Sequence, residues 1–541
     1  IEFKVGESRY HSYSIDQVLD YSLDLKNFHE KSHNAVLLPI LVATESKTSH
    51  IKIQAYEDKV YSPILSNKSS LSHVITQCIK EINEPSISPT DWMNSQYKPT
   101  PTIIEAAQAL YQGHSVKEIS RSDAGAINLS KTADCINGII AESKQNGTKS
   151  ICFITGVPGS GKTLAGLNLA NERHKFEEEE HAVFLSGNGP LVEVLQEALA
   201  RNQKEILNSS IRKSEALSKA KAFIQNIHHF RDEALRDNNP PIERVVVFDE
   251  AQRAWTAEQT SNFMIKKKGV PNFNMSEPEF LISIMDRHAT WAVIICLIGG
   301  GQEINTGEAG LLEWFSALNN RYQNWKIFIS DTITDYEYTR GHDLKELLTN
   351  QSVTIQKDLH LNTSIRSFRS EKVSNFVKSV LDYNIQAASS LYNELSKKYP
   401  IVITRDIHKA KKWLISKCRG TERIGILASS GADRLKPYGI FVQLKIEAKN
   451  WFLNHKNDIR SSYYLEDVAT EFDVQGLELD WTCVAWDADL RIENNQWAFK
   501  KFRGTTWQNI NDPNGIIYLK NAYRVLLTRA RQGMVIFIPE G

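Results

Sequence analysis

A glycine-rich segment carries the residues with the clearest chemistry. In ICFITGVPGSGKTLAGLNLA, Gly156, Gly161, Lys162 and Thr163 follow the order G-x-x-x-x-G-K-T, after an apolar run and before a helical one. Glycines let backbone N–H groups wrap phosphates, and the following helix adds its positive dipole end. We expect Lys162 to reach the β- and γ-phosphates of ATP and Thr163 to ligate Mg²⁺. The residues expected at this phosphate site are Gly156, Pro158, Gly159, Ser160, Gly161, Lys162, Thr163 and Leu164.

Two adjacent carboxylates form the second signature. Asp249 and Glu250 end the apolar run in RVVVFDEAQRAW. Ligand sites of α/β proteins lie at the carboxyl ends of strands, so this pair is expected at such an edge. Asp249 would hold Mg²⁺, and Glu250 would position and activate the attacking water. The alternative is a pair that merely caps the next helix, which is less favoured downstream of a phosphate loop.

These groups require elements that bring them together. From residue 150 onward, short apolar runs alternate with amphipathic stretches, which is typical of parallel α/β sheets. A chain of 541 residues is too long for one core, so two to four domains are expected. The strand candidates suffice for two sheets; they are ICFITG, AVFLSG, RVVVFDE, AVIICLIGG, KIFIS, IVITR, IGILASS, TCVAWD and MVIFIP.

Composition narrows the class of protein. Apolar residues make up 41% of the chain and charged residues 24%, which is ordinary for globular proteins. The charges of the 64 basic and 64 acidic residues cancel. Binding to a phosphate backbone must therefore come from a local basic surface. The six cysteines show neither CxxC nor zinc spacing, which favours a reduced, cytoplasmic location. No apolar stretch reaches the roughly 18 residues needed to cross a bilayer.

The ordered set of motifs resembles a superfamily 1 helicase, and more closely the Schlafen group-3-like DNA/RNA helicase family. The segments that carry the resemblance are FLSGNGPLVEVL (motif Ia), GGGQEINTGEAG (motif III), LNTSIRSFRS (motif IV), TEFDVQGLELD (motif V) and NAYRVLLTRAR (motif VI). The resemblance implies an α/β chain with two RecA-like P-loop NTPase domains in tandem, preceded by a small nuclease-like α/β domain and a helical linker. ATP would lie in the cleft between the two domains, and a single strand would cross both.

The resemblance also assigns roles to individual residues. Gln302 would sense the γ-phosphate, Arg366 would bind it, and Arg529 would be the arginine finger that makes hydrolysis depend on cleft closure. Asn188, Thr470, Gln475 and Gly476 are placed near the nucleic acid and Glu478 near the ribose, with Gly476 and Glu478 completing the nucleotide-binding set. Taken singly, each of these residues has an ordinary explanation, such as a surface cation or a turn; their order and spacing favour the functional one.

The chain departs from the helicase pattern at two points. The glutamine that usually reads adenine before the P-loop is not evident, and Asn128 and Ser130 stand in that region, which leaves ATP versus GTP open. About a hundred residues separate Arg366 from Thr470, which leaves no room for a large inserted subdomain. The resemblance therefore fits a compact motor that translocates or remodels without processive unwinding.

Strand binding has weaker candidates. Trp255 and Trp314 could stack on bases, although core packing is the favoured explanation for each. Four basic segments could line a phosphate track, although most such segments are solvated faces; they are RKSEALSKAK, IKKKG, HKAKKW and KKFR.

The N-terminal region resembles a PD-(D/E)XK nuclease core. Glu2 and Lys4 lie on an expected strand, and Gln17 and Tyr21 are i, i+4 neighbours on the expected next helix. Glu2 would bind Mg²⁺, Lys4 would orient water, and Gln17 and Tyr21 would support them. The Asp that such a core carries on an earlier strand does not precede Glu2 in this chain, so we expect poor nuclease activity.

The sequence thus predicts four regions: a nuclease-like domain at 1–85, a linker and helical region at 86–148, and RecA-like domains at 149–350 and 351–541. The predicted function is an ATP-dependent translocase or helicase that uses ATP and Mg²⁺ and acts on single-stranded nucleic acid, with DNA favoured over RNA. The alternatives are a nucleotide-switched sensor and an ATP-gated nuclease. Bacterial defence against foreign DNA is a setting in which a nuclease-like domain fused to a motor would serve.

Overall fold

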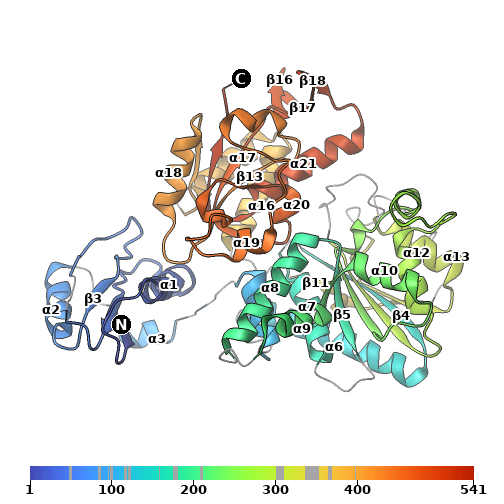
Figure 1. Cartoon of the computed structure of the whole chain (residues 1–541), viewed down its shortest axis with the longest axis horizontal. Coiled ribbons are helices and arrows are strands. Elements are labelled where there is room, and N and C mark those ends of the chain that lie inside the picture. The colour runs from blue at the N-terminus through green and yellow to red at the C-terminus, as the bar shows by residue number, and fades with distance from the viewer. Residues whose placement is uncertain are drawn as a thin grey trace. The chain divides into compact units, whose positions relative to one another are not determined.

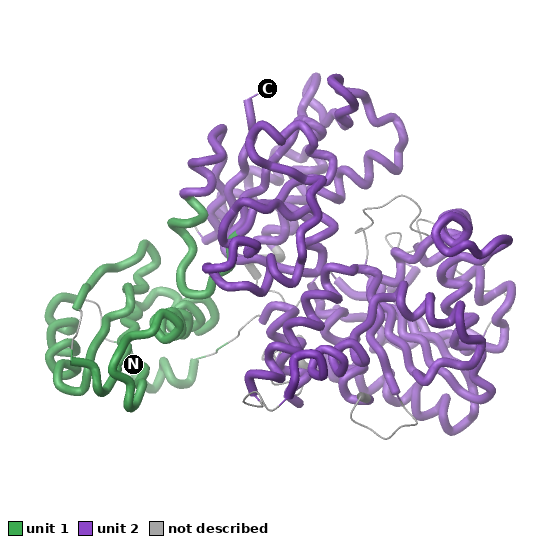
Figure 2. The backbone as a smooth tube through the Cα atoms, viewed as in Figure 1, with its two compact units in different colours: residues 1–100, 413–424 green, residues 101–412, 425–541 purple. Residues whose placement is uncertain are grey.

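The computed structural model divides the chain into two compact units. The first contains residues 1–100 and 413–424, and the second contains 101–412 and 425–541 (Figure 2). No helix among the described residues is both long and apolar enough to cross a membrane. The structure describes residues 1–47, 51–82, 87–95, 97, 101–114, 119, 123–157, 159–174, 181–206, 211–299, 310–334, 352–362, 368–396 and 398–540.

A small parallel sheet forms the centre of the first unit. Its order is β1-β2-β3, with all neighbours parallel. The long helix α1 connects β1 to β2, and Val18, Leu19 and Leu23 of this helix are buried. The bounds are β1 (Glu2–Lys4), α1 (Ser12–Phe28), β2 (Ile40–Ala43), β3 (Ile64–Ser66), α2 (Leu71–Glu81) and α3 (Pro89–Met93).

Residues 413–424 belong to this first unit although they lie far along the chain. The Arg419 guanidinium donates to both carboxylate oxygens of Asp58, at 3.0 and 2.9 Å, and stacks over the Tyr56 ring. Thr421 donates its backbone N–H and its hydroxyl to Asp20 of α1, both at 3.0 Å. The sequence-based division had placed this segment in the last region, 351–541.

The Asp58–Arg419 pair predicts an acid-sensitive contribution to stability. Burial by itself would raise the pKa of Asp58, but the hydrogen bonds and charge of Arg419 outweigh it and lower that pKa. The stability that the Asp58–Arg419 pair contributes is therefore present at pH values above the ordinary pKa of Asp, and it is lost as the pH falls below about 4. We expect Asp58→Asn to lower the free energy of unfolding by about 1–2 kcal/mol at pH 7 and by less at pH 3.5, measured by urea denaturation.

The control is Glu45→Gln, which removes the exposed ion pair to Lys68. Its effect should stay within about 0.5 kcal/mol at either pH. Equal losses from the two substitutions would contradict the assignment of this stability to the half-buried Asp58 pair.

A large parallel sheet forms the core of the first half of the second unit. Its order is β10-β9-β4-β8-β7-β5-β6, and β11 pairs with β4. Helices cover both faces (Figure 1). Side chains of β4 alternate: Cys152 and Ile154 pack with one helical layer, Ile151 and Phe153 with the other. The strands are β4 (Lys149–Gly156), β5 (Ala182–Ser186), β6 (Ile224–Asn226), β7 (Val245–Asp249), β8 (Ala292–Leu297), β9 (Trp325–Ile329), β10 (Val353–Ile355) and β11 (His360–Leu361).

The helices around this sheet follow the amphipathic stretches of the sequence. Within the predicted linker and helical region, 86–148, the described residues include helices α3, α4 and α6. The bounds are α4 (Ile103–Tyr111), α6 (Asp123–Asn146), α7 (Lys162–His174), α8 (Gly189–Ile206), α9 (Lys213–Phe223), α10 (Ile227–Arg236), α11 (Ala257–Phe263), α12 (Glu277–Asp286) and α13 (Leu312–Arg321).

A second parallel sheet, of order β12-β19-β15-β13-β14, forms the rest of the second unit. A separate antiparallel sheet, β16-β17-β18, follows β15 directly. The strands are β12 (Ile401–Thr404), β13 (Ile424–Ala428), β14 (Val468–Ala469), β15 (Leu479–Ala485), β16 (Leu490–Glu493), β17 (Gln496–Arg503), β18 (Thr506–Asn509) and β19 (Ala530–Phe537). The helices are α16 (Phe368–Leu381), α17 (Ile385–Leu395), α18 (Ile407–Lys417), α19 (Ala448–Leu453), α20 (Glu471–Val474) and α21 (Pro513–Leu527).

All nine apolar runs proposed as strands after residue 150 form strands, which confirms a mixed α/β chain with two parallel sheets. Central strands of parallel sheets are buried on both faces, so their continuous apolar runs stand out in the sequence. The short strands β6, β10, β11 and β14 and the antiparallel strands β16 to β18 were not predicted.

Candidate functional site

The predicted phosphate loop joins β4 to α7. Gly159 and Gly161 have φ angles of +76° and +85°, a left-handed conformation that glycine adopts without strain. At Gly156, a Cβ atom would lie 2.6 Å from Ser160 Oγ and 2.8 Å from Leu361 Cβ. The loop therefore requires glycine at these positions.

Lys162 and Thr163 begin α7 at the carboxyl end of β4. The Lys162 ammonium donates to the backbone oxygens of Gly156 (2.7 Å) and Val157 (3.3 Å), so the side chain folds over the loop. The Thr163 hydroxyl donates to Asp249 Oδ1 at 3.2 Å. The structure thus brings together the two residues predicted to hold Mg²⁺, from β7 and from the first turn of α7.

Asp249 and Glu250 lie at the carboxyl end of β7, as the sequence predicted. Burial, and then the negative charge of Glu250, raise the pKa of Asp249, while Thr163 and Lys162 partly offset the rise. A divalent cation at this position would favour the ionised carboxylate, which fits a metal-binding role. Glu250 has a left-handed φ of +51°, a conformation that non-glycine residues adopt at a cost and often at functional sites.

Gln252 is a residue of this site that the sequence analysis did not single out. It is buried, and its amide nitrogen donates to Glu250 Oε2. Its side-chain oxygen accepts from Gly299 N at 3.0 Å, and its backbone oxygen accepts from Gly310 N at 2.9 Å. Gln252 therefore connects the carboxylate to both ends of the GGGQEINTGEAG segment. The sequence feature that could have identified Gln252 is its position two residues after Glu250.

We expect Gln252→Ala to lower kcat for ATP hydrolysis by about tenfold to a hundredfold, because Glu250 loses the group that orients it. ATP affinity should change little, since no phosphate-loop residue is removed. Steady-state hydrolysis and ATP titration measure the two quantities. The matched control is Gln323→Ala, at an exposed glutamine that donates to Asn319 O. A Gln252→Ala enzyme with unchanged kcat would exclude this orienting role.

A second chain of contacts joins the two sheets of the second unit. Arg253 donates to Gln475 Oε1, and Asn188 Nδ2 donates to Gln475 O at 2.6 Å. Gly476 follows with a φ of +77°, and a Cβ there would lie 3.1 Å from Leu191. The structure therefore brings the predicted motif Ia and motif V residues into direct contact, and Arg253, which was not predicted, is part of that contact.

The other predicted residues of the second sheet make local contacts. The backbone N–H and the hydroxyl of Thr470 both donate to Asp473 Oδ2 at the start of α20. Glu478 directly precedes β15, and its Oε2 lies 4.0 Å from Arg531 Nε. Arg529 is buried, with Nε donating to Val525 O and Nη2 donating to Thr528 Oγ1 at the end of α21.

Three predicted site residues, Pro158, Gln302 and Arg366, lie outside the described residues. Trp255 packs against His228, Phe263 and Arg231, with its ring 5.3, 5.2 and 5.4 Å from them. Trp314 is fully buried, as the core-packing alternative expected. Asn128 and Ser130, which stand where the adenine-reading glutamine was expected, lie on α6.

One known protein family matches most of the chain. Residues 149–540 match the family model described as Schlafen group 3, DNA/RNA helicase domain. The chain belongs to this family. It is therefore a helicase-type protein, of the class that acts on nucleic acid. Residues 1–148 lie outside the match.

Two solved helicase structures are similar to this Schlafen group 3 chain at a low level. The Hef helicase domain from Pyrococcus furiosus has 13% identity over 74% of this chain and 94% of that chain, with a TM-score of 0.24. The DUF1998 helicase MrfA, in a structure bound to DNA, has 12% identity over 82% of this chain and 50% of that chain, with a TM-score of 0.27. A search of curated proteins finds no match.

Outside the helicase match, the four predicted residues of the first unit form one cluster. Lys4 Nζ donates to Glu2 Oε1 at 3.0 Å and to Gln17 Oε1 at 2.7 Å. Gln17 Nε2 donates to Tyr21 Oη at 2.8 Å. Strand β1 and helix α1 therefore place the E-x-K pair and its two predicted supports side by side.

Proposed function

We propose that the chain is an ATP-dependent translocase or helicase that moves on single-stranded nucleic acid, built on two RecA-like domains. The observation that carries the proposal is the contact chain between the two parallel sheets. It runs from the phosphate loop through Asp249 and Glu250 to Gln252, and from the neighbouring Arg253 to Gln475. A change at the γ-phosphate could thus alter the contact with the second sheet, which is what a motor requires.

The residues present fit ATP and Mg²⁺. Ser160 Oγ is buried and has no hydrogen-bond partner among the described residues, so the loop holds a polar group available to a phosphate. Lys162 and the loop N–H groups would bind the phosphates, and Thr163 and Asp249 would hold Mg²⁺, which supplies charge neutralisation at the transferred phosphoryl group. Arg366 and Arg529 would complete the site from the second RecA-like domain.

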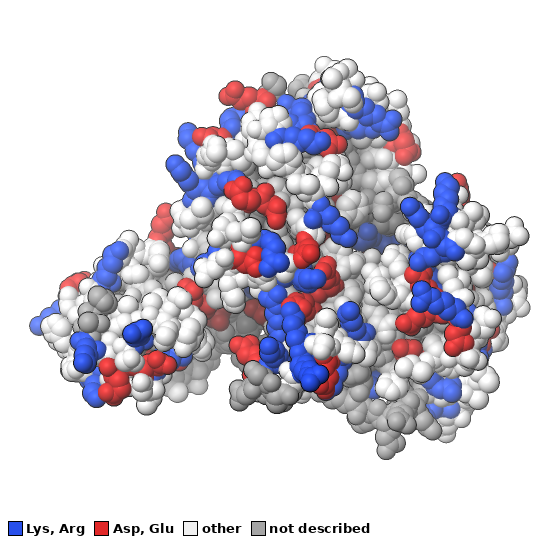
Figure 3. All heavy atoms as spheres, in the orientation of Figure 1, with Lys and Arg blue, Asp and Glu red and all other residues white. Residues whose placement is uncertain are grey.

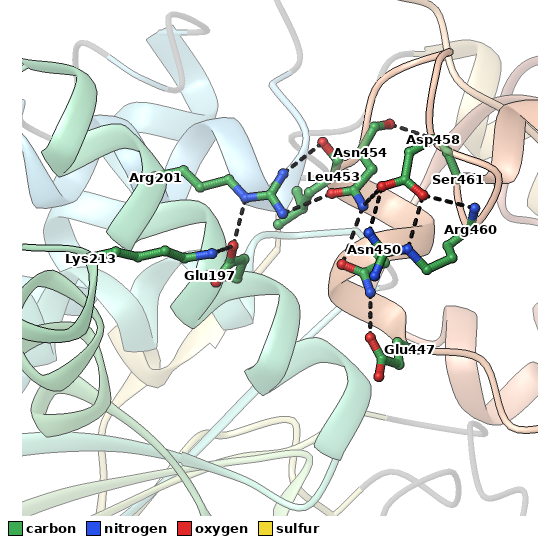
Figure 4. A network of polar contacts seen from close by, with 10 residues as sticks. All are labelled: Glu197, Arg201, Lys213, Glu447, Asn450, Leu453, Asn454, Asp458, Arg460 and Ser461. Atoms are coloured by element: carbon green, nitrogen blue, oxygen red, sulfur yellow. Dashed lines mark hydrogen bonds and ion pairs between the residues drawn. The ribbon is translucent and has the colours of Figure 1, made fainter.

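Polar contacts join α8 to the C-terminal end of α19. Arg201 donates to Leu453 O at 3.1 Å and to Asn454 Oδ1 at 2.8 Å, while Glu197 accepts from Arg201 and Lys213 (Figure 4). Buried apolar residues of both helices, such as Leu195 of α8 and Trp451 of α19, belong to the same core cluster. We infer that closure and opening of the two domains remodel both the polar and the apolar contacts of this junction.

The test is ATP hydrolysis with and without single-stranded DNA and RNA. We expect stimulation by one type of strand and loss of all hydrolysis in Lys162→Ala, a reduction of about a thousandfold or more, because the P-loop lysine stabilises the charge of the transition state. The strand that stimulates identifies the track. The melting temperature of Lys162→Ala is measured alongside, so that a loss of hydrolysis is not mistaken for a loss of folding.

A nucleotide-switched sensor is the competing function. Hydrolysis that Lys162→Ala abolishes, but that neither DNA nor RNA stimulates, would favour the sensor and overturn the motor. ATP-dependent displacement of a labelled strand would then separate unwinding from translocation in a motor that passes the first test.

We propose in addition that the first unit is a nuclease-like core. The hydrogen-bonded set of Glu2, Lys4, Gln17 and Tyr21 is the observation that favours it. Glu2 would be a metal ligand, and Lys4 would orient the attacking water. Mn²⁺ binding measured by calorimetry tests this: Glu2→Gln should weaken binding, and Glu45→Gln should not. Equal binding by both variants would exclude Glu2 as a ligand.

A further inference from the structure

Arg253 lies three residues after Glu250, at the end of the short turn that follows β7. Its backbone N–H donates to Glu250 O at 2.9 Å, which closes one turn of 3₁₀ helix over Ala251–Arg253. Within the same turn, the side chain of Gln252 donates to Glu250 Oε2. A single turn closed by such hydrogen bonds has few free dihedral angles. A displacement of Glu250 at the proposed ATP site would therefore also displace Arg253.

The side chain of Arg253 reaches Gln475, which directly follows α20. Arg253 Nη1 donates to Gln475 Oε1. Gln475 is only 4% exposed, and its Nε2 is buried with no hydrogen-bond partner among the described residues. Buried polar atoms normally have a hydrogen-bond partner. The Gln475 amide is thus held through one of its two polar atoms, and the group that holds it is Arg253.

The backbone of Gln475 is held by a different element of the first large sheet. Asn188, between β5 and α8, donates from Nδ2 to Gln475 O at 2.6 Å, and its Oδ1 accepts from Leu191 N at 3.3 Å. Both polar atoms of the Asn188 side chain are therefore used within the protein. Leu191 and Val474 lie in one buried apolar cluster beside these contacts. Gln475 is thus held by residues that follow two strands, β7 and β5.

Helix α20 extends these contacts into the second parallel sheet. Glu471, in the first turn of α20, is buried and accepts from the backbone N–H and the hydroxyl of Ser430, at 2.9 and 2.6 Å. Ser430 lies in the loop after β13. Because α20 is a single helical turn, Glu471 and Gln475 lie at its two ends and move together. The contacts therefore run from the turn that carries Glu250 to the loop after β13.

Contacts between α8 and α19 at the surface are of another kind. Lys449 Nζ lies 3.2 Å from Glu193 Oε1, and the two side chains are 40% and 41% exposed. Figure 3 shows side chains of both charges mixed over these helices. Water and salt screen exposed ion pairs, so such pairs contribute little and constrain geometry weakly. A buried hydrogen bond depends on distance and angle, so the Gln475 contact is the more sensitive to the relative position of the two sheets.

We propose that Arg253, Gln475 and Asn188 form a relay that makes ATP hydrolysis depend on the bound nucleic-acid strand. A strand bound beside Asn188 and the start of α20 would hold Gln475 in place. Gln475 would then hold Arg253, and with it the turn that presents Glu250 to the attacking water. Arg253 is in this sense a positioning residue that acts through Glu250. The inference rests on the proposed nucleic-acid motor and identifies how the strand would regulate its ATP site.

The test is the ratio of strand-stimulated to basal kcat, with the Kd for a fluorescent oligo-dT and its RNA counterpart measured on the same whole chain. Arg253→Met and Gln475→Leu should each lower the ratio by about tenfold and leave the strand Kd within about threefold of wild type. Arg253→Lys retains a cationic donor and should recover part of the ratio. The double variant should lose no more than the larger single loss, because both substitutions break one contact.

The matched control is Arg244→Met, at a half-buried arginine that directly precedes β7. Its guanidinium donates to Thr290 Oγ1 at 3.1 Å and to Trp291 O at 2.9 Å, at the end of the sheet opposite the phosphate loop. Its stimulation ratio should equal that of wild type. An equal loss in Arg244→Met would show a general effect of removing an arginine from this domain and would overturn the relay.

The other outcomes separate the relay from the proposed function. Wild-type hydrolysis that neither DNA nor RNA stimulates overturns the motor and the relay together. Wild-type stimulation that Arg253→Met retains in full leaves the motor intact and overturns the relay. A loss of strand affinity in Gln475→Leu that matches its loss of stimulation shows direct contact of Gln475 with the strand and also overturns it. Losses that multiply in the double variant show independent action and contradict the relay as well.

Discussion

Replacing Glu250 by Gln is expected to lower kcat for ATP hydrolysis by about a hundredfold to ten-thousandfold while ATP still binds. Gln is nearly isosteric but cannot accept a proton from the attacking water. The phosphate loop and the Thr163–Asp249 contact remain, so nucleotide affinity should be within about threefold of wild type. Single-turnover hydrolysis and titration with a fluorescent ATP analogue measure the two quantities.

The control is Glu258→Gln, at an exposed carboxylate of α11 eight residues along the chain. It should leave kcat unchanged. A Glu250→Gln enzyme that retains more than about a tenth of wild-type kcat would contradict the assignment of Glu250 as the group that activates water. A loss of binding together with kcat would show instead that Glu250 shapes the nucleotide site.

Removing Arg231 is expected to have the largest effect on stability. Arg231 of α10 is fully buried, and its Nη1 donates to Glu277 Oε1 of α12 at 2.9 Å. Its guanidinium also lies 4.9 Å from the Phe263 ring. Breaking a buried ion pair strands the remaining charge, so Arg231→Met should lower the free energy of unfolding by about 3–5 kcal/mol, measured by urea denaturation.

Two features distinguish this explanation from simple loss of packing. Burial raises the pKa of Glu277, and Arg231 opposes that rise. Without Arg231 the folded protein therefore favours the protonated carboxyl more strongly, so its stability falls as the pH rises above the ordinary Glu pKa. The loss in Arg231→Met should be larger at pH 8 than at pH 5.5. Adding Glu277→Gln should restore part of the stability at pH 8; no recovery would contradict a stranded charge.

The phosphate site and the central strands were predictable because their causes are local. A phosphate loop needs glycines, a lysine and a hydroxyl within eight consecutive residues, and Gly159 and Gly161 adopt the left-handed conformations that the motif requires. Fully buried strands such as β4, β7 and β8 leave continuous apolar runs. The alternation with helices then places Asp249 near Thr163, since carboxyl ends of parallel strands meet at one edge.

The E-x-K cluster was predictable for a related reason. Gln17 and Tyr21 share a helix face by their spacing, and Glu2 and Lys4 share a strand face by theirs. A β–α–β connection brings the two faces together. The contacts of Lys4 with Gln17 follow from these periodicities.

Side-chain partners that are distant in sequence were not predictable. Arg419 and Asp58 are 361 residues apart, and Arg253 and Gln475 are 222 apart. Nothing in RKSEALSKAK or KKFR distinguishes Lys213, which pairs with Glu197, from Arg503, which pairs with no described carboxylate. The sequence favoured packing for Trp255, but nothing near it in the chain identified His228 and Arg231 as the residues it packs on.

Local patterns therefore specified the phosphate loop, the two carboxylates and the nine strands, because backbone geometry and burial act over a few neighbouring residues. The folding of 413–424 into the first unit and the contacts of Gln252 with Glu250 and Gly299 depend on which distant surfaces meet. Those contacts arise when whole elements pack, and the packing energy is shared among many weak contacts that no short stretch of sequence encodes.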